Sequence, residues 1–320
     1  MTKQESCKIT FRQRHFFAIL QDFFAKQDIM KKFILLAMII GAAACGKTDD
    51  QLAMEQYESA DSAYKAGNHA LALAYIDSLN TKYPKQVAAR KKAKIIELNI
   101  KIAEQERNLQ TADSMLQISQ EAFNSSTDGF NFEKNEKYQS EGNFTVKGQE
   151  TLRIAGRTML KPYITERGEL QIHSQCVGRT GHTKIAVSCG DRTEESEEIA
   201  KGSAYNHIYT AGDAKHQTLV IKQNADKIAS LIAENASATI KVTLMENRKA
   251  TTSYIMSQQD KNAIAKAVEL SQKLKTLMEY KHQKEVAERK IEVFQHSLAQ
   301  YEAEATLSNN NNEKQQNTKP

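Results

Sequence analysis

Two long stretches of the chain carry apolar residues at seven-residue intervals. In residues 85–123 no glycine or proline interrupts the repeat, which runs through Ala88, Ile95, Ile102, Leu109, Leu116 and Phe123. Residues 257–304 show a similar repeat that is broken at Lys284, and Ser257 and Asp260 have the spacing of a capping box at its start. Heptads indicate helices that pair along an apolar seam. Each stretch is therefore predicted to be one long helix.

The two helices enclose the middle of the chain, so antiparallel pairing would bring both ends of that middle segment together. Charge supports this pairing, because basic residues at the start of the first helix would lie near acidic residues of the second. The residues concerned are Arg90, Lys91, Lys92 and Lys94, and Glu285, Glu288, Glu292 and Glu302. Heptads do not identify their partner. A homo-oligomer, in which each helix pairs with a second copy, therefore stays open.

Apolar residues alternate with polar ones in residues 143–256. The alternation is clear at Ile185 and Val187 and again at Ile240, Val242 and Leu244, and it predicts antiparallel strands with one solvated face. One short helix fits residues 224–234. We therefore predict an α+β protein in which an antiparallel β-sandwich-like domain is inserted between the helices of an antiparallel coiled-coil stalk. Residues 124–142 are predicted to be a linker and residues 305–320 a disordered tail.

Residues 51–84 predict two shorter helices that are separated at Gly67 and Asn68. Thr48 and Gln51 have the spacing of a capping box at the start. The segment resembles a tetratricopeptide-type helical hairpin, and the matching positions are Ala60, Tyr64, Gly67, Ala72, Leu73, Leu79, Tyr83 and Pro84. Stacked repeats need about three units for stability. A single unit is therefore predicted to be a helical hairpin that docks on its neighbour and forms no peptide groove.

Residues 30–45, MKKFILLAMIIGAAAC, have the three parts of a signal peptide. Lys31 and Lys32 precede an apolar run at residues 33–40 and small residues at 41–44. The run is shorter than the ~20 residues that span a bilayer. Cys45, directly after three alanines, resembles the lipobox cysteine of bacterial lipoproteins. The resemblance implies that residues 30–44 are removed and that Cys45 is acylated and held in a membrane.

An ordinary secretory signal with an unmodified cysteine is the alternative to lipidation. Residues 1–29 precede the signal. We predict that they result from a misassigned start codon and that translation begins at Met30. The alternative interpretation is that they form a cytoplasmic extension. Residues 45–50 are predicted to be a lipidated tether.

The net charge of +5 belongs mainly to the segment that the signal interpretation removes. Residues 1–44 hold seven of the 44 basic and three of the 39 acidic residues, so the remainder has a net charge near +1. A nucleic-acid partner usually leaves a basic patch or stripe as its footprint. We therefore predict no nucleic-acid partner.

Cys176 and Cys189 are the cysteines that remain after Cys45. Outside the cytoplasm such a pair favours a disulfide, but a hairpin centred near residues 179 and 180 would place the two out of register. Both interpretations stay open: two unlinked core cysteines, or a disulfide. A zinc site of His173, Cys176, His182 and Cys189 would need side chains from opposite faces of strands, so no metal site is predicted.

The sequence contains no nucleophile elbow, glycine-rich phosphate loop or paired-histidine helix motif, so no catalytic residue and no cofactor is predicted. We predict a non-catalytic lipoprotein of the cell envelope, in the outer membrane and facing either the periplasm or the cell exterior. Its β-rich head would bind a protein or another envelope component. The alternatives are an envelope enzyme with an unfamiliar site in the head, and an assembly scaffold that acts through the hairpin at residues 51–84.

Overall fold

The computed structural model describes residues 47–137, 140–149, 156–178, 181–211 and 213–316 of the 320-residue chain. The predicted signal peptide, Cys45 and residues 1–29 lie outside the described residues. The chain divides into two compact units: unit 1 holds residues 1–100 and 298–320, and unit 2 holds residues 101–297. Among the described residues, no helix is both long enough and apolar enough to cross a membrane.

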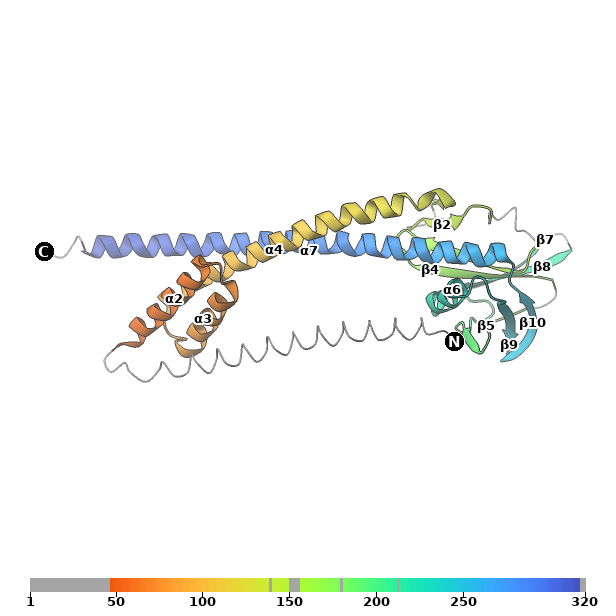
Figure 1. The fold of residues 1–320 in the computed structure, drawn as a ribbon, viewed down its shortest axis with the longest axis horizontal. Coiled ribbons are helices and arrows are strands. Elements are labelled where there is room, and N and C mark those ends of the chain that lie inside the picture. Colours follow the sequence, from red (N-terminus) through yellow and green to blue (C-terminus); the bar gives the residue numbers. More distant parts are fainter. Residues whose placement is uncertain (1–46, 138–139, 150–155, 179–180, 212, 317–320) are drawn as a thin grey trace, which may run out of the picture. The chain divides into compact units, whose positions relative to one another are not determined.

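Unit 1 is helical (Figure 1). It contains α2 (Asp49–Lys65), α3 (His69–Lys82), the start of α4 (Val87–Asn124) and the end of α7 (Gln258–Gln316). The predicted capping box is confirmed, because the Thr48 side chain accepts from the Gln51 N–H and the Gln51 side chain accepts from the Thr48 N–H. Gly67, at a φ of 74°, ends the first helix, and the Asn68 side chain caps the second at 3.1 Å.

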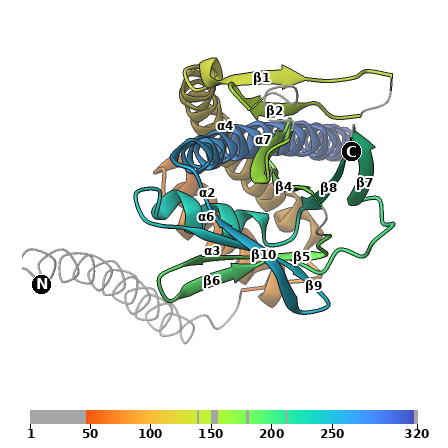
Figure 2. The ribbon, with the colours of Figure 1, turned by 90° about the vertical axis from the view of Figure 1, so that its right-hand side faces the viewer.

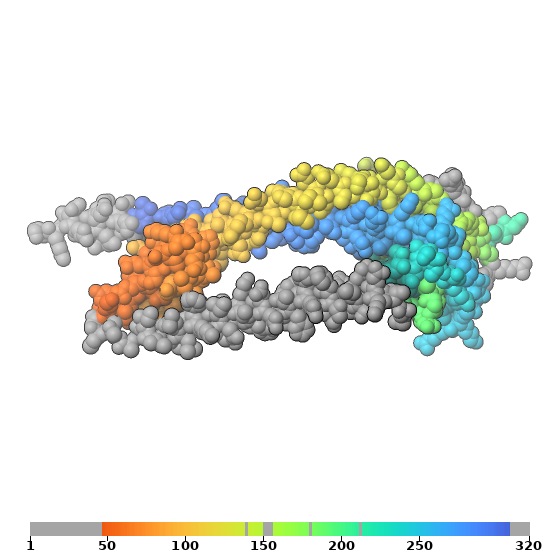
Figure 3. All heavy atoms as spheres, in the orientation of Figure 1, coloured from red at the N-terminus to blue at the C-terminus, as the bar shows by residue number. Residues whose placement is uncertain are grey.

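Small side chains let the helices of unit 1 approach closely, and Figure 3 shows the atoms of α2 and α3 in orange, packed together. The buried core residues are Ala53, Ala60, Ala63, Ala72, Ile76, Leu79, Ala89, Ala93, Ile96 and Ile100. Lys91 pairs with Glu304 of α7 at 2.7 Å, and not with one of the four glutamates that the sequence suggested.

Unit 2 contains two antiparallel sheets, which confirms the predicted α+β class. The first has the strand order β1 (Phe130–Glu133), β2 (Asn143–Val146), β3 (Met159–Thr165), β4 (Leu170–Val177), β8 (Ala214–Ile221), β7 (Asn206–Ala211). The second has the order β10 (Lys249–Ile255), β9 (Lys241–Glu246), β5 (Lys184–Cys189), β6 (Arg192–Glu195).

Helices complete the core of unit 2. Helix α6 (Ala225–Glu234) contacts β4 of one sheet and β5 and β6 of the other, and in Figure 2 it lies below α7 and above β5 and β6. Its apolar side chains Ile228, Leu231 and Ile232 are fully buried. The first part of α7 adds six residues to the same core: Ala263, Ile264, Ala267, Leu270, Leu274 and Leu277.

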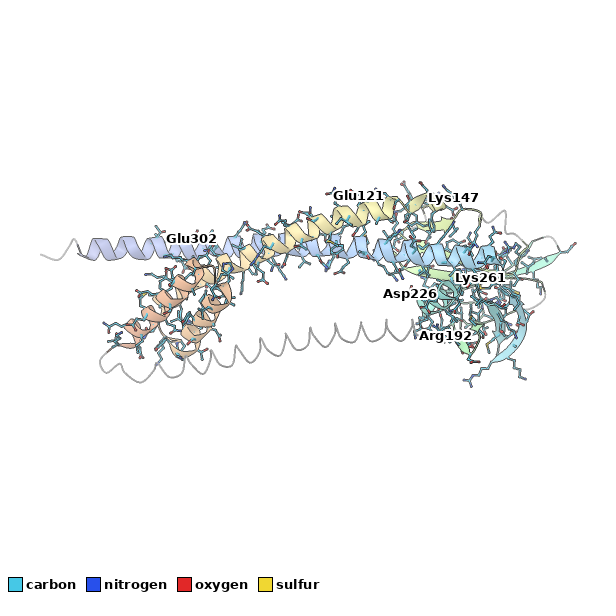
Figure 4. All side chains as sticks on the ribbon, viewed as in Figure 1. Glu121, Lys147, Arg192, Asp226, Lys261 and Glu302 are labelled. Carbon is cyan, nitrogen blue, oxygen red and sulfur yellow. The ribbon has the colours of Figure 1, made fainter. Side chains whose placement is uncertain are left out.

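Ion pairs at the surface hold α6 to its neighbours. Asp226 pairs with Lys275 of α7 at 3.1 Å, and Glu234 pairs with Arg192 of β6 at 3.0 Å; Figure 4 labels Asp226 and Arg192. Exposed pairs of this kind contribute only about 0–1 kcal/mol each. The position of α6 therefore depends mainly on its buried apolar side.

Within unit 2, α4 and α7 run antiparallel. Asp113 of α4 pairs with Lys284 of α7 at 2.7 Å, and the Lys101 Nζ lies 5.8 Å from the Phe294 ring centroid. Residue numbers on one helix rise as those on the other fall. Both contacts join α4 to α7 of the same chain.

The predicted linker at residues 124–142 is wrong in part. It contains a 3-10 turn, η2 (Thr127–Gly129), followed by β1, whose Phe132 lies opposite Phe144 of β2 with ring centroids 4.9 Å apart. These aromatic contacts stabilise a short strand, although polar residues surround it in the sequence.

The predicted hairpin between the segments that contain Cys176 and Cys189 is also wrong. Strand β4 pairs with β3 and β8, whereas β5 pairs with β6 and β9 in the other sheet. The connection between β4 and β5, whose residues 179 and 180 lie outside the described residues, thus carries the chain from one sheet to the other.

The structure also corrects the predicted tail, because α7 continues to Gln316. No glycine or proline interrupts the sequence between Ser257 and Pro320, so nothing in the covalent chain stops the helix at the predicted residue 304.

Candidate functional site

The six-stranded sheet buries one face and leaves the other partly open. Along β4 the buried residues Leu170, Ile172, Ser174 and Cys176 alternate with partly exposed ones. His173 therefore lies on the outer face and Cys176 on the inner face, as strand geometry requires for residues three apart.

Cross-strand pairing gathers polar and aromatic side chains at the middle of the outer face. Lys161 lies opposite His173 in the β3–β4 register. The Tyr163 and His173 rings stack with centroids 3.9 Å apart, and the Lys161 Nζ lies 4.6 Å from the Tyr163 ring centroid. We call Lys161, Tyr163 and His173 the sheet-face cluster.

The outer face continues onto β8 and β7. Tyr209 of β7 stacks on His216 of β8 with ring centroids 5.1 Å apart and planes 8° apart. Nearby, the Lys222 Nζ lies 4.6 Å from the ring centroid of Tyr205. Tyr205 and Tyr209 are 46% and 50% exposed, so this part of the face presents aromatic rings to solvent at the edge of the sheet.

An open hollow of about 590 Å³ lies beside the sheet-face cluster. Its walls come from β1, β2, β3 and β4 and from the chain after β1: Phe132, Glu133, Lys134, Asn135, Asn143, Tyr163, Gln171 and His173. Lys134 at its rim pairs with Glu166 at 3.1 Å. The hollow thus combines aromatic surface with amide and charged groups.

His173 and Tyr163 of the sheet-face cluster are neutral at pH 7. Burial, with smaller contributions from Lys161, His207 and Lys222, lowers the pKa of His173 to about 3. Burial and then Glu133 raise the pKa of Tyr163 to about 12. Efficient general acids and bases have pKa values near the working pH. These two side chains are therefore suited to stacking and hydrogen bonding and not to proton transfer.

A second polar cluster lies inside unit 2. The His182 Nδ1 is 3.1 Å from the Gln217 Oε1, and the His182 Nε2 is 2.9 Å from the Ser174 Oγ. The Gln217 Nε2 donates to the His182 carbonyl oxygen at 2.6 Å and to the Asn206 Oδ1 at 2.8 Å. The Gln217 oxygen must therefore accept, which assigns the imidazole proton to Nδ1 and lets Nε2 accept from the Ser174 hydroxyl.

The order serine, histidine and amide oxygen is that of a nucleophile triad. However, Ser174 and His182 are both 0% exposed, and neither lines the hollow described above. A substrate could not reach the hydroxyl. The cluster instead joins β4, the connection that follows it, β8 and β7.

The structure separates the other residues that the sequence singled out. Cys176 is buried in one sheet, Cys189 is half-buried in the other, and no disulfide joins them. His173 and His182 belong to different clusters. Among the described residues, no group of three or more histidine, cysteine or acidic side chains is arranged to bind a metal.

Sequence reasoning missed the sheet-face cluster because Pro162 stands between Lys161 and Tyr163, and proline argues against a central strand. In the structure β2 pairs with β3 only from Tyr163 to Thr165. Pro162 lies beyond the end of the pairing with β2, so the N–H that proline lacks has no β2 partner to lose. The alternation of Lys161, Tyr163 and Thr165 was the available signal.

Comparison with known proteins identifies no relative: no protein-family model, no curated protein and no solved structure matches the chain.

Proposed function

We propose that the protein is a non-catalytic lipoprotein of the cell envelope that binds a partner protein through the outer face of its six-stranded sheet. In this proposal Cys45 carries the lipid, α4 and α7 act as a coiled-coil stalk, and the two sheets form a sandwich-like head. The observation that carries it is that separate stacked sets of aromatic and basic side chains, one around Tyr163 and His173 and one at Tyr209 and His216, lie on the same face of one sheet.

The chemistry of this face favours binding. Tyrosine is enriched at protein interfaces because it offers a large apolar ring together with a hydroxyl group. The exposed ring of Tyr209 lies on the edge strand β7, and the exposed ring of Tyr205 lies just before that strand. Edge strands offer unpaired backbone groups to a partner as well. A partner protein could therefore pack against the aromatic rings and also pair one of its strands or loops with the backbone of the edge strand.

The anchor is tested by mass spectrometry of the protein from its native host. We expect an N-terminal acylated Cys45, and we expect Cys45→Ala to release the protein into the soluble fraction. An intact Met1 together with an unmodified thiol at position 45 would contradict the anchor.

The binding face is tested by photocrosslinking in intact cells. A photoreactive residue at Tyr205 should give one partner adduct, which Tyr209→Ala should weaken. The matched position is Val293, which is 60% exposed on α7 and should give none. Equal adducts from both positions would contradict the proposal. An adduct from Leu71 of α3 instead would favour the scaffold alternative.

A further inference from the structure

The junction between α3 and α4 in unit 1 is strongly basic. Residues 82–94 contain no acidic residue and six basic ones: Lys82, Lys85, Arg90, Lys91, Lys92 and Lys94. We call these six residues the basic junction.

Lys82 is favourable in the last turn of α3, but the basic residues at the start of α4 oppose the stability of that helix. The N-terminus of a helix carries partial positive charge, so acidic residues stabilise it and basic residues destabilise it. Helix α2 follows the rule with Asp49 and Asp50 in its first turn, whereas α4 has no acidic residue there. Like charges one turn apart add to the cost. Helix stability therefore does not explain the basic residues of α4.

Half of the basic junction is already engaged within unit 1. The Arg90 Nε donates to the Asn80 Oδ1 at 2.9 Å, Lys91 pairs with Glu304, and Lys94 pairs with Glu97 at 3.0 Å. Arg90, Lys91 and Lys94 line an open hollow of about 380 Å³.

The other half is exposed. Lys82, Lys85 and Lys92 extend into solvent, and the Lys92 Nζ lies 5.7 Å from the Tyr57 ring centroid. These three lysines provide positive charge that a partner can reach.

The hairpin places the basic junction near the predicted anchor. Helix α3 packs against α2 and follows it after a short turn, so its last residue, Lys82, returns to the end where α2 begins. Cys45 is four residues before Asp49, and four residues span at most about 14 Å. Asp49 and Asp50 lie at the same end, but the three exposed lysines outnumber them.

We propose that the basic junction contacts the anionic phospholipid headgroups of the membrane in which Cys45 is anchored. The inference rests on the proposed lipid anchor. Clusters of lysine and arginine beside an anchor attract anionic lipid, and the attraction decays within a Debye length of about 8–10 Å. A tether of four residues lets the basic junction approach the bilayer within this distance, and the contact would orient unit 1 on the bilayer.

The test uses residues 46–320 without lipid and vesicles with or without phosphatidylglycerol in phosphatidylcholine. Cosedimentation should show binding to the anionic vesicles only, and 0.5 M salt should abolish it. The triple variant Lys82→Gln, Lys85→Gln, Lys92→Gln should bind on the order of 100-fold more weakly, since each basic residue contributes about fivefold. The matched control is Lys241→Gln, Lys249→Gln, Lys266→Gln, which removes the same charge from exposed positions of unit 2 and should bind normally.

Equal binding to both vesicle types, or equal losses in the two triple variants, would overturn the inference. Circular dichroism of both variants excludes loss of helix as the cause. The chain in this test carries no lipid, so its result is independent of the anchor: acylation at Cys45 with no vesicle binding would reject the basic junction alone.

Discussion

At the scale of single residues, His182 shows how burial fixes a charge state. Its ring is enclosed by Ser174 and Gln217, and burial is the main cause that lowers its pKa to about 4. In the unfolded chain a histidine titrates near 6.5. Between these two values the unfolded state binds more protons than the folded state. The free energy of unfolding therefore falls as the pH falls from about 6.5 to about 4.

We predict that His182 alone accounts for about 3 kcal/mol of lost stability between pH 7 and pH 4, because its pKa shift spans about 2.5 units. Urea unfolding at pH 7, 5.5 and 4 measures the loss. His182→Gln should flatten the pH dependence, and the exposed His296→Gln should leave it unchanged. His173, with its pKa near 3, acts in the same direction, so some slope will remain. Identical slopes for the wild type and His182→Gln would contradict the assignment.

At the scale of elements, the turn between β3 and β4 lies directly against α7. The Ser271 Oγ donates to the Gly168 carbonyl oxygen at 2.6 Å. Gly168 has a φ of +83°, and a Cβ added there would lie 2.9 Å from the backbone nitrogen of Lys275. Both the left-handed backbone and the close approach require glycine. This contact fixes where the hairpin meets the helix.

Gly168→Ala is predicted to destabilise unit 2 by about 2–4 kcal/mol, from backbone strain and from the shift of the turn away from α7. Gly202→Ala is the matched control, since Gly202 has a φ of +80° with no atom within 4 Å of the added Cβ. It should cost only about 1–2 kcal/mol. Thermal and urea unfolding compare the two variants, and equal losses would show that the contact with α7 does not matter.

The elements whose formation depends on local spacing could be predicted from the sequence. The heptads at Ile102 and Leu116 identified α4 because a helical period depends only on local spacing, and capping residues such as Thr48 act over three residues. Strand pairing depends on contacts between distant segments. The alternation at Ile185 and Val187 therefore identified β5 but could not show that its neighbours are β6 and β9. The sheet-face cluster depends on such pairing, so it became visible only in the structure.

At the scale of the whole molecule, α7 belongs to both units. Residues 258–297 belong to unit 2, where Ala263 to Leu277 contribute to the core, and residues 298–316 belong to unit 1, where Glu304 pairs with Lys91. Helix α4 also has residues in both units. Two chain segments are thus shared between the units, although the buried core of unit 1 comes from α2, α3 and the start of α4.

Gln300→Pro is predicted to break α7 near the boundary, because proline in a helix interior costs about 3 kcal/mol. Hydrogen exchange should become faster in α7 after residue 297, while α2, α3 and the strands of unit 2 keep their protection. Gln300→Ala, at the same exposed position, should leave hydrogen exchange unchanged in the helices and in the strands of unit 2. Faster exchange throughout the β-sheets would show that the two units unfold together.

The division of α7 between the units also sets an order of assembly. A ribosome makes α2, α3 and the start of α4 first and residues 298–316 last, so unit 1 must wait for its final segment while all of unit 2 is synthesised. Helices as short as α2 and α3 are marginal in isolation, but their shared core with the start of α4 is complete before residues 298–316 are made. A nonsense mutation shortly after residue 297 would therefore yield a chain with a finished β-rich unit and a helical unit that lacks only its final segment.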